Sequence, residues 1–167
     1  LKSMNRPYSR EKFLQLVSSL RSVNHNMRIS TDIIVGYPGE TEAEFQETIS
    51  AFKEAAFEMA FIFKYSERSG TLAAQFPDKI PQEVKEERNQ TLLGILDRQS
   101  EESNLKKINK IMEVLVESQA RKGRGDLMGR TRCYRKVIFP AVRDLIGQMV
   151  PVQINEASST ILKGSLV

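Results

Sequence analysis

Two stretches of this sequence carry residue types that could take part in chemistry. The first is the turn Gly36-Tyr37-Pro38-Gly39, which lies between the apolar run Ile33-Ile34-Val35 and the segment Thr41-Glu42-Ala43-Glu44. Ligands of α/β proteins bind at such turns, outside the carboxyl end of a strand and next to a helix N-terminus. The second stretch, residues 121–136, holds seven lysines and arginines against one acid, Asp126. A basic run of this kind is typical of a surface that tracks the phosphates of a nucleic acid.

Each stretch also fits a simpler interpretation. The two glycines fit a tight turn that binds nothing, because short glycine motifs are unspecific. The basic run fits a solvated hairpin without a ligand. Tyr134, inside the basic run, adds an aromatic ring that could stack on a base. Motif spacing alone therefore does not decide whether either stretch binds a ligand.

The spacing of apolar residues predicts the strands and the helix around the glycine turn. Ile33-Ile34-Val35 is typical of a strand buried on both faces of a parallel sheet. Thr41 and Glu44 form a predicted capping box, and an apolar stripe beginning at Phe45 follows at helical spacing. A second strand is predicted over residues 59–66, and the loop 67–74 after it should lie at the same end of the sheet as the glycine turn.

Two further helices are predicted. Ser9 can cap a helix whose apolar residues share one face. A charged helix from Gln82 to about Lys107 would connect two parts of the chain. Its candidate packing positions are Val84, Leu92, Ile95 and Leu105.

The last third of the chain changes from helical to alternating periodicity. Met112, Val114 and Val116 alternate with Glu113 and Glu117, as in a half-buried strand. Four more short segments, each bounded by turn residues, follow at 127–132, 135–139, 149–157 and 160–167. Five strands in so short a span predict a small closed OB-like barrel. The predicted fold class is therefore α/β plus all-β, with domains at 1–104 and 105–167.

Composition narrows the class of protein. The 167 residues are 40% hydrophobic and 28% charged, as in a globular protein, and no apolar run reaches the length of a membrane span. The first residues lack the apolar core of a signal peptide, and the start at Leu1 resembles a cut inside a longer protein. The single cysteine, Cys133, fits a reducing, cytoplasmic setting and cannot by itself hold an iron–sulfur cluster. Residues 100–167 hold twelve basic and seven acidic side chains, which favours a polyanionic partner for this part of the chain.

Several motifs resemble one known family, the radical S-adenosylmethionine (SAM) methylthiotransferases. Residues 30–41 are similar to its STDIIVGFPGET segment, with Tyr37 where Phe is usual, and residues 65–74 match its YSxRxGTxAA segment. Residues 80–88 follow its VPEEVKxxR helix. Residues 129–139 match the GRTxxNRxVxF pattern of its TRAM domain, a small RNA-binding barrel, with Tyr134 in place of Asn. The resemblance covers essentially the whole chain.

This resemblance implies the C-terminal part of a MiaB-type tRNA methylthiotransferase: the end of a (βα)6 radical SAM barrel, a connector helix and a TRAM domain. Such an enzyme adds a methylthio group to N6-isopentenyladenosine next to the anticodon, using SAM and two [4Fe–4S] clusters. The cluster cysteines are not in this sequence, so we expect the chain alone to be inactive. It would line part of the site for SAM and substrate, and it would bind the anticodon stem-loop of tRNA. The N-terminal domain and the first half of the barrel would be its missing partners.

The resemblance also suggests site residues, although it assigns no catalytic residue and no metal ligand. Those implied for cofactor binding are Thr31, Asp32, Val35, Gly36, Tyr65, Ser66 and Arg68. Those expected to bind RNA are Arg121, Lys122, Arg124, Arg130, Arg132, Tyr134, Arg135 and Lys136.

Two alternatives remain open at this point. One is the sister enzyme that methylthiolates an aspartate of a ribosomal protein, but its branch usually has Glu near the position of Arg68. The other is a non-catalytic TRAM module that only binds RNA.

Overall fold

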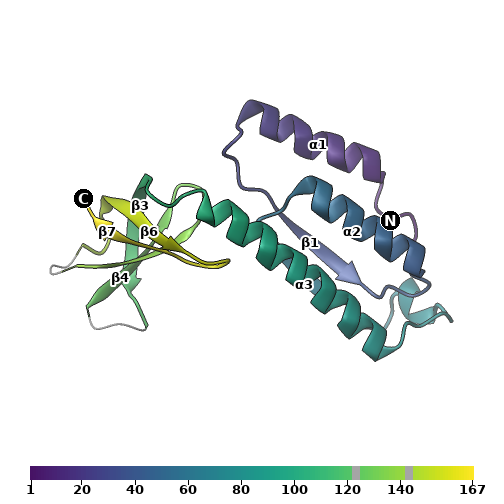
Figure 1. Cartoon of the computed structure of the whole chain (residues 1–167). Coiled ribbons are helices and arrows are strands. Elements are labelled where there is room, and N and C mark those ends of the chain that lie inside the picture. The colour runs from purple at the N-terminus through teal and green to yellow at the C-terminus, as the bar shows by residue number, and fades with distance from the viewer. Residues whose placement is uncertain (122–124, 142–144) are drawn as a thin grey trace. The chain divides into compact units, whose positions relative to one another are not determined.

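The computed structural model describes residues 1–121, 125–141 and 145–167, which form two compact units, Leu1–Leu96 and Asp97–Val167 (Figure 1). Predicted RNA-binding residues Lys122 and Arg124 lie outside the described residues. Each unit has an apolar core of its own.

The first unit is built on two parallel strands. β1 (Ser30–Val35) pairs with β2 (Met59–Lys64) in register from Ser30↔Met59 to Val35↔Lys64. The helix between them, α2 (Glu42–Ala55), provides the crossover that parallel pairing requires. α1 (Arg10–Val23) precedes the sheet, and the short 3-10 helix η1 (Leu72–Gln75) follows it.

The core of this unit lies on one face of the sheet only. It joins apolar residues of α1, β1, α2 and the following helix α3 (Gln82–Leu105), among them Val17, Val35, Phe52 and Leu92. The prediction that the first strand is buried on both faces is wrong for Ile34, which is 42% exposed. Successive strand residues point to opposite faces, and no described element covers the face that carries Ile34.

α3 runs without a break from the first unit into the second, and Gly94 lies within it. Leu92 and Ile95 are buried as predicted, whereas Leu105 is 48% exposed and does not pack as predicted. The compact second unit begins at Asp97, so it includes the last turns of this helix. Among the described residues, no helix is long and apolar enough to cross a membrane.

The second unit confirms the predicted five-stranded closed barrel. Its strands are β3 (Ile111–Gln119), β4 (Asp126–Thr131), β5 (Lys136–Pro140), β6 (Met149–Ala157) and β7 (Leu162–Leu166). Their order around the barrel is β3-β4-β5-β7-β6, and β3 pairs with β6 to close it. Only the β5–β7 pair is parallel among these pairings.

Two glycines allow the strands to approach closely enough for closure. A Cβ atom on Gly129 would lie 2.2 Å from the Leu115 carbonyl oxygen, and one on Gly164 would lie 2.2 Å from that of Gln153. Both clashes are with backbone, which cannot rotate away as a side chain can. Inward-pointing valines such as Val114 and Val152 fill the interior and are fully buried.

Candidate functional site

The turn between β1 and α2 needs glycine at two positions. Gly36 has φ +72° and Gly39 has φ +80°, values that residues with a Cβ atom rarely adopt. At Gly36 the space is also taken, because a Cβ atom there would lie 2.3 Å from Cγ of Lys85. The backbone of the turn therefore requires glycine at these positions whether or not a ligand binds there.

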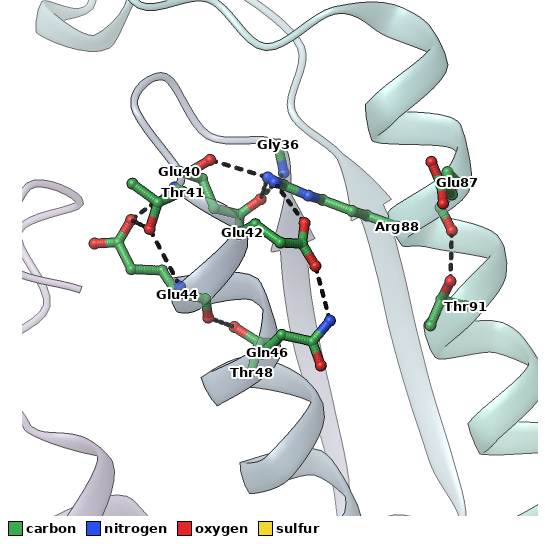
Figure 2. A network of polar contacts seen from close by, with 10 residues as sticks. All are labelled: Gly36, Glu40, Thr41, Glu42, Glu44, Gln46, Thr48, Glu87, Arg88 and Thr91. Atoms are coloured by element: carbon green, nitrogen blue, oxygen red, sulfur yellow. Dashed lines mark hydrogen bonds and ion pairs between the residues drawn. The ribbon is translucent and has the colours of Figure 1, made fainter.

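A buried ion pair holds this turn in place (Figure 2). Oε2 of Glu40 accepts a hydrogen bond from the Gly36 amide at 2.7 Å and one from Nη1 of Arg88 at 2.6 Å. Nη1 of Arg88 also donates to the Glu40 carbonyl oxygen at 3.1 Å, and Nη2 donates to Glu42 at 3.2 Å. Arg88 is 5% exposed, and its guanidinium carbon lies 5.1 Å from the centre of the Phe45 ring. The sequence interpretation missed this network, because its two charges are far apart in the chain.

The predicted capping box is confirmed at the start of α2. The Thr41 hydroxyl accepts from the Glu44 amide at 3.2 Å, and the Glu44 carboxylate accepts from the Thr41 amide at 2.8 Å (Figure 2). The amide and hydroxyl of Thr41 lower the pKa of Glu44 below its usual value, because both donate to the charged carboxylate. The position of the helix start beside the glycine turn is thus set by local hydrogen bonds.

Aromatic rings line the carboxyl end of the sheet. Tyr37 packs edge-on against Tyr65 and Phe76, with ring centres 5.4 and 6.2 Å apart. Lys85 donates to the Tyr65 carbonyl oxygen at 3.3 Å, and its ammonium lies 5.5 Å from the centre of the Tyr65 ring. The Tyr65 hydroxyl is buried and has no hydrogen-bond partner among the described residues.

The cofactor residues implied by the resemblance do not form one surface. Thr31 and Val35 point to the helix-covered face, where Val35 is fully buried, so the Val35 side chain can meet no ligand. Asp32 lies on the opposite, open face. Gly36, Tyr65 and Ser66 come together at the carboxyl ends of the strands, where the Tyr65 amide donates to the Val35 carbonyl oxygen at 2.8 Å. Arg68 is exposed in the loop after β2.

The open face of the two-stranded sheet is strongly apolar. Ile34, Phe61 and Phe63 are 42%, 57% and 52% exposed. The two phenylalanine rings lie nearly parallel, with centres 6.4 Å apart. A neighbouring apolar surface or ligand is the usual reason for such a patch.

On the barrel, most of the predicted RNA-binding residues are accessible. Arg121, Arg132, Tyr134 and Lys136 are exposed, and Arg130 is partly so. Two of the arginines already face acids on β3: Arg130 donates to Glu117 at 2.7 and 3.0 Å, and Arg132 donates to Glu113 at 2.8 Å.

Arg135 differs from the other basic residues of this stretch. It is 4% exposed, and its guanidinium donates to the side-chain oxygens of Asn104 and, at 3.0 Å, Ser103. Asn104 is itself buried and donates to the carbonyl oxygens of Ser158 and Ser159 at 2.7 and 3.2 Å. This arginine thus joins the β4–β5 turn to the end of α3 inside the second unit. Its side chain does not present the accessible charge that the prediction of RNA contact required.

Tyr134 has a backbone conformation that explains the pattern at this position. Its φ is +64°, in the left-handed region where Asn is several-fold enriched over other residues with a Cβ atom. The guanidinium carbon of Arg130 lies 4.4 Å from the centre of its ring. With Tyr in place of the usual Asn, the turn is kept but its backbone is more strained. The tyrosine ring adds a cation–π contact.

The described residues do not form a metal site. Groups of three or more metal-ligating side chains are absent from the described residues, and the sequence contains one cysteine and one histidine. Carboxyl groups with a lowered pKa, such as Glu42 with its donors Gln46 and Arg88, are exposed. The described residues therefore bring no set of potential cluster ligands together.

The fold and this sequence pattern define a class for the second unit. Residues 105–167 match the family model of the TRAM domain, so this part of the chain is a TRAM domain.

Comparison with curated proteins extends the similarity to the whole chain. It is 45% identical over all of its 167 residues to the tRNA-2-methylthio-N(6)-dimethylallyladenosine synthase of Opitutus terrae, of which it covers 35%. It is 46% identical to the synthase of Clostridium botulinum strain Hall, over 98% of the chain and 36% of that protein. It is 44% identical to the synthase of Bacillus mycoides, over 100% of the chain and 33% of that protein. The chain thus spans about a third of the length of these relatives. This identity along the whole chain confirms the predicted resemblance to the tRNA methylthiotransferases.

Proposed function

We propose that this chain is the C-terminal part of a radical SAM enzyme that adds a methylthio group to N6-dimethylallyladenosine in tRNA. The identity of about 45% along the entire chain to proteins that bear this name is the observation that carries the proposal. The relatives from Opitutus terrae, Methylacidiphilum infernorum and Bacillus mycoides carry the tRNA name, which favours the tRNA enzyme over the ribosomal-protein enzyme.

In this proposal the first unit, extended to residue 104, supplies the last strands of a (βα)6 barrel. The one-sided core and the open face with Ile34, Phe61 and Phe63 support it, since the inner strand face of a barrel is covered only when the barrel is complete. The parallel pairing of β1 and β2 around α2 supports it as well.

The carboxyl ends of β1 and β2 would form part of the SAM site. The Gly36–Glu40 turn and the exposed Ser66 and Arg68 fit a polar ligand there, whereas Asp32 lies farther back along β1. Bound SAM would supply the radical and methyl chemistry. The role of this chain would be to hold and orient the ligand and to exclude water. Iron–sulfur ligands do not fit a chain with one cysteine, so the clusters would be held by other parts of the protein.

The TRAM domain would bind the tRNA, at the anticodon stem-loop, in a cytoplasmic enzyme. The exposed cations Arg121, Arg132 and Lys136 support an RNA partner.

A chimera tests the proposal. This chain would replace the matching third of the Opitutus terrae synthase, in a host that lacks its own synthase, and 2-methylthio-N6-dimethylallyladenosine in tRNA would be measured by mass spectrometry. We expect the modified nucleoside to return, and to be lost when Gly36 is replaced by Val. A folded, cluster-loaded chimera that leaves the tRNA without methylthio groups would contradict the proposal.

A further inference from the structure

One row of side chains crosses four neighbouring strands on the outside of the barrel. Met149 of β6 is paired with Leu115 of β3, Leu115 is paired with Arg130 of β4, and Arg130 is paired with Lys136 of β5. The residues next to them in each strand, such as Val116 and Val137, are buried in the core. Strand alternation therefore places all four side chains of this row, here called the outer row, on the surface.

The outer row is apolar at one end and basic at the other. Leu115 is 41% exposed and Met149 is 49% exposed, although both are large hydrophobic side chains. Arg130 lies at the centre with the exposed ring of Tyr134 against its guanidinium, and Lys136 continues the row. This surface combines apolar side chains, cations and an aromatic ring. It matches a ligand that carries both a flat ring and a negative charge.

Acids beside the row lower its net charge without removing its cations. Glu117 accepts from Arg130, and both side chains are about one-third exposed, at 30% and 32%. Ion pairs that keep contact with water contribute little to stability. A phosphate can therefore replace Glu117 as the partner of Arg130 at small cost.

We propose that the outer row binds unpaired nucleotides of RNA, with Leu115 and Met149 packed against a base and Arg130 and Lys136 paired with phosphates. The proposal rests on the RNA-binding part of the proposed function and specifies the kind of RNA and the residues. Duplex RNA presents phosphates and 2′-hydroxyl groups and keeps its base faces stacked, so it would leave the apolar end of the row without a partner. An unpaired nucleotide offers a base face and a phosphate together.

The test is a binding measurement on the full 167-residue chain by fluorescence anisotropy. The probes are a short RNA hairpin with an unpaired loop, a fully paired duplex of the same length, and poly-glutamate. We expect the hairpin to bind more tightly than the duplex. The double variant Leu115→Ser/Met149→Ser should lose about tenfold in hairpin affinity while its salt dependence stays the same, because base packing releases no counterions.

Control variants separate the row from its surroundings. Ile111→Ser, on the outer face of the same strand and 61% exposed, should bind the hairpin as wild type does. The conservative pair Leu115→Met/Met149→Leu should retain binding, and the thermal unfolding of the serine variant should match that of the wild type, which excludes misfolding as the cause of its loss. Glu117→Gln should tighten binding, because it removes the acid that competes for Arg130.

Three outcomes overturn parts of this reasoning in distinguishable ways. A serine double variant that binds the hairpin like wild type, or that loses duplex and hairpin binding equally, would overturn the base contact while RNA binding stands. Poly-glutamate that binds as tightly as the hairpin, with the same dependence on Leu115 and Met149, would make the row a surface for an acidic protein. If wild-type chain binds none of the RNA probes at low salt, the RNA-binding part of the proposed function fails first.

Discussion

Replacing Asn104 by alanine should destabilise the second unit strongly, although Asn104 lies on a helix and outside the barrel. Its side-chain oxygen accepts from the guanidinium of Arg135, and its amide donates to the carbonyl oxygens of Ser158 and Ser159. Asn104 is 3% exposed and Arg135 is 4% exposed, so water cannot easily replace the lost partner of the charged group.

The magnitude follows from the kinds of bond that are lost. A hydrogen bond to a charged group contributes about 1.5–3 kcal/mol, and a neutral one about 0.5–1.5 kcal/mol. The two carbonyl oxygens lie in a partly exposed turn and can turn to water, so they add little. We therefore expect the free energy of unfolding to fall by about 1.5–3 kcal/mol.

The assay is unfolding in urea, monitored through the hydrogen–deuterium exchange of peptides from the barrel. This readout reports on the second unit within the full chain. Asn155→Ala is the matched control, because its amide makes one exposed hydrogen bond to Ser165 at 3.2 Å, and it should change stability by less than about 0.5 kcal/mol. Arg135→Met combined with Asn104→Ala should cost less than the two single changes together, since the partners are then removed as a pair. An Asn104→Ala chain as stable as the control would refute this account of the buried arginine.

Three further predictions concern the barrel and α2. Gly129→Ala should destabilise the barrel by about 1–3 kcal/mol or prevent its closure, because the added Cβ meets backbone at 2.2 Å; thermal unfolding checks this. Tyr134→Asn should raise the free energy of unfolding by about 1 kcal/mol in the same measurement, since Asn tolerates a φ of +64° better; a less stable variant would mean that the ring contact outweighs the strain. Because the pKa of Glu44 is lowered, its contribution is present at neutral pH and is lost as the pH falls through the pKa of the folded state. Glu44→Gln should therefore weaken the acid dependence of stability in a pH titration of unfolding, and an unchanged acid limb would contradict the role of the Thr41 cap.

Local features of this chain could be predicted well from the sequence. The capping box of Thr41 and Glu44 depends only on residues three apart, and the strand Met149–Ala157 alternates buried and exposed side chains as far as Asn155. The structure reproduces both, because the interactions that decide them are contained in the pattern itself.

Features that depend on distant partners could not be predicted. Nothing in the basic run distinguishes Arg135 from Arg132, yet one is buried against Asn104 and the other is exposed, because the difference comes from a helix earlier in the chain. The pairing of Glu40 with Arg88 likewise joins two segments that share no motif. Apolar content alone predicted burial for Ile34, but burial requires a covering surface, which the described residues do not provide on that face.

The way the barrel closes has a consequence for its synthesis. β3, β4 and β5 pair with their neighbours in sequence, but closure needs Ile111 to meet Gln153 and Val137 to meet Leu162. At about 5–20 residues per second, a ribosome needs about one to three seconds to make the chain from β5 to the end of β6. During that interval the first three strands are an incomplete sheet with two unpaired edges, the state in which strands most readily join other chains. Nascent copies of this barrel on neighbouring ribosomes would therefore be most prone to mispairing just before β6 emerges.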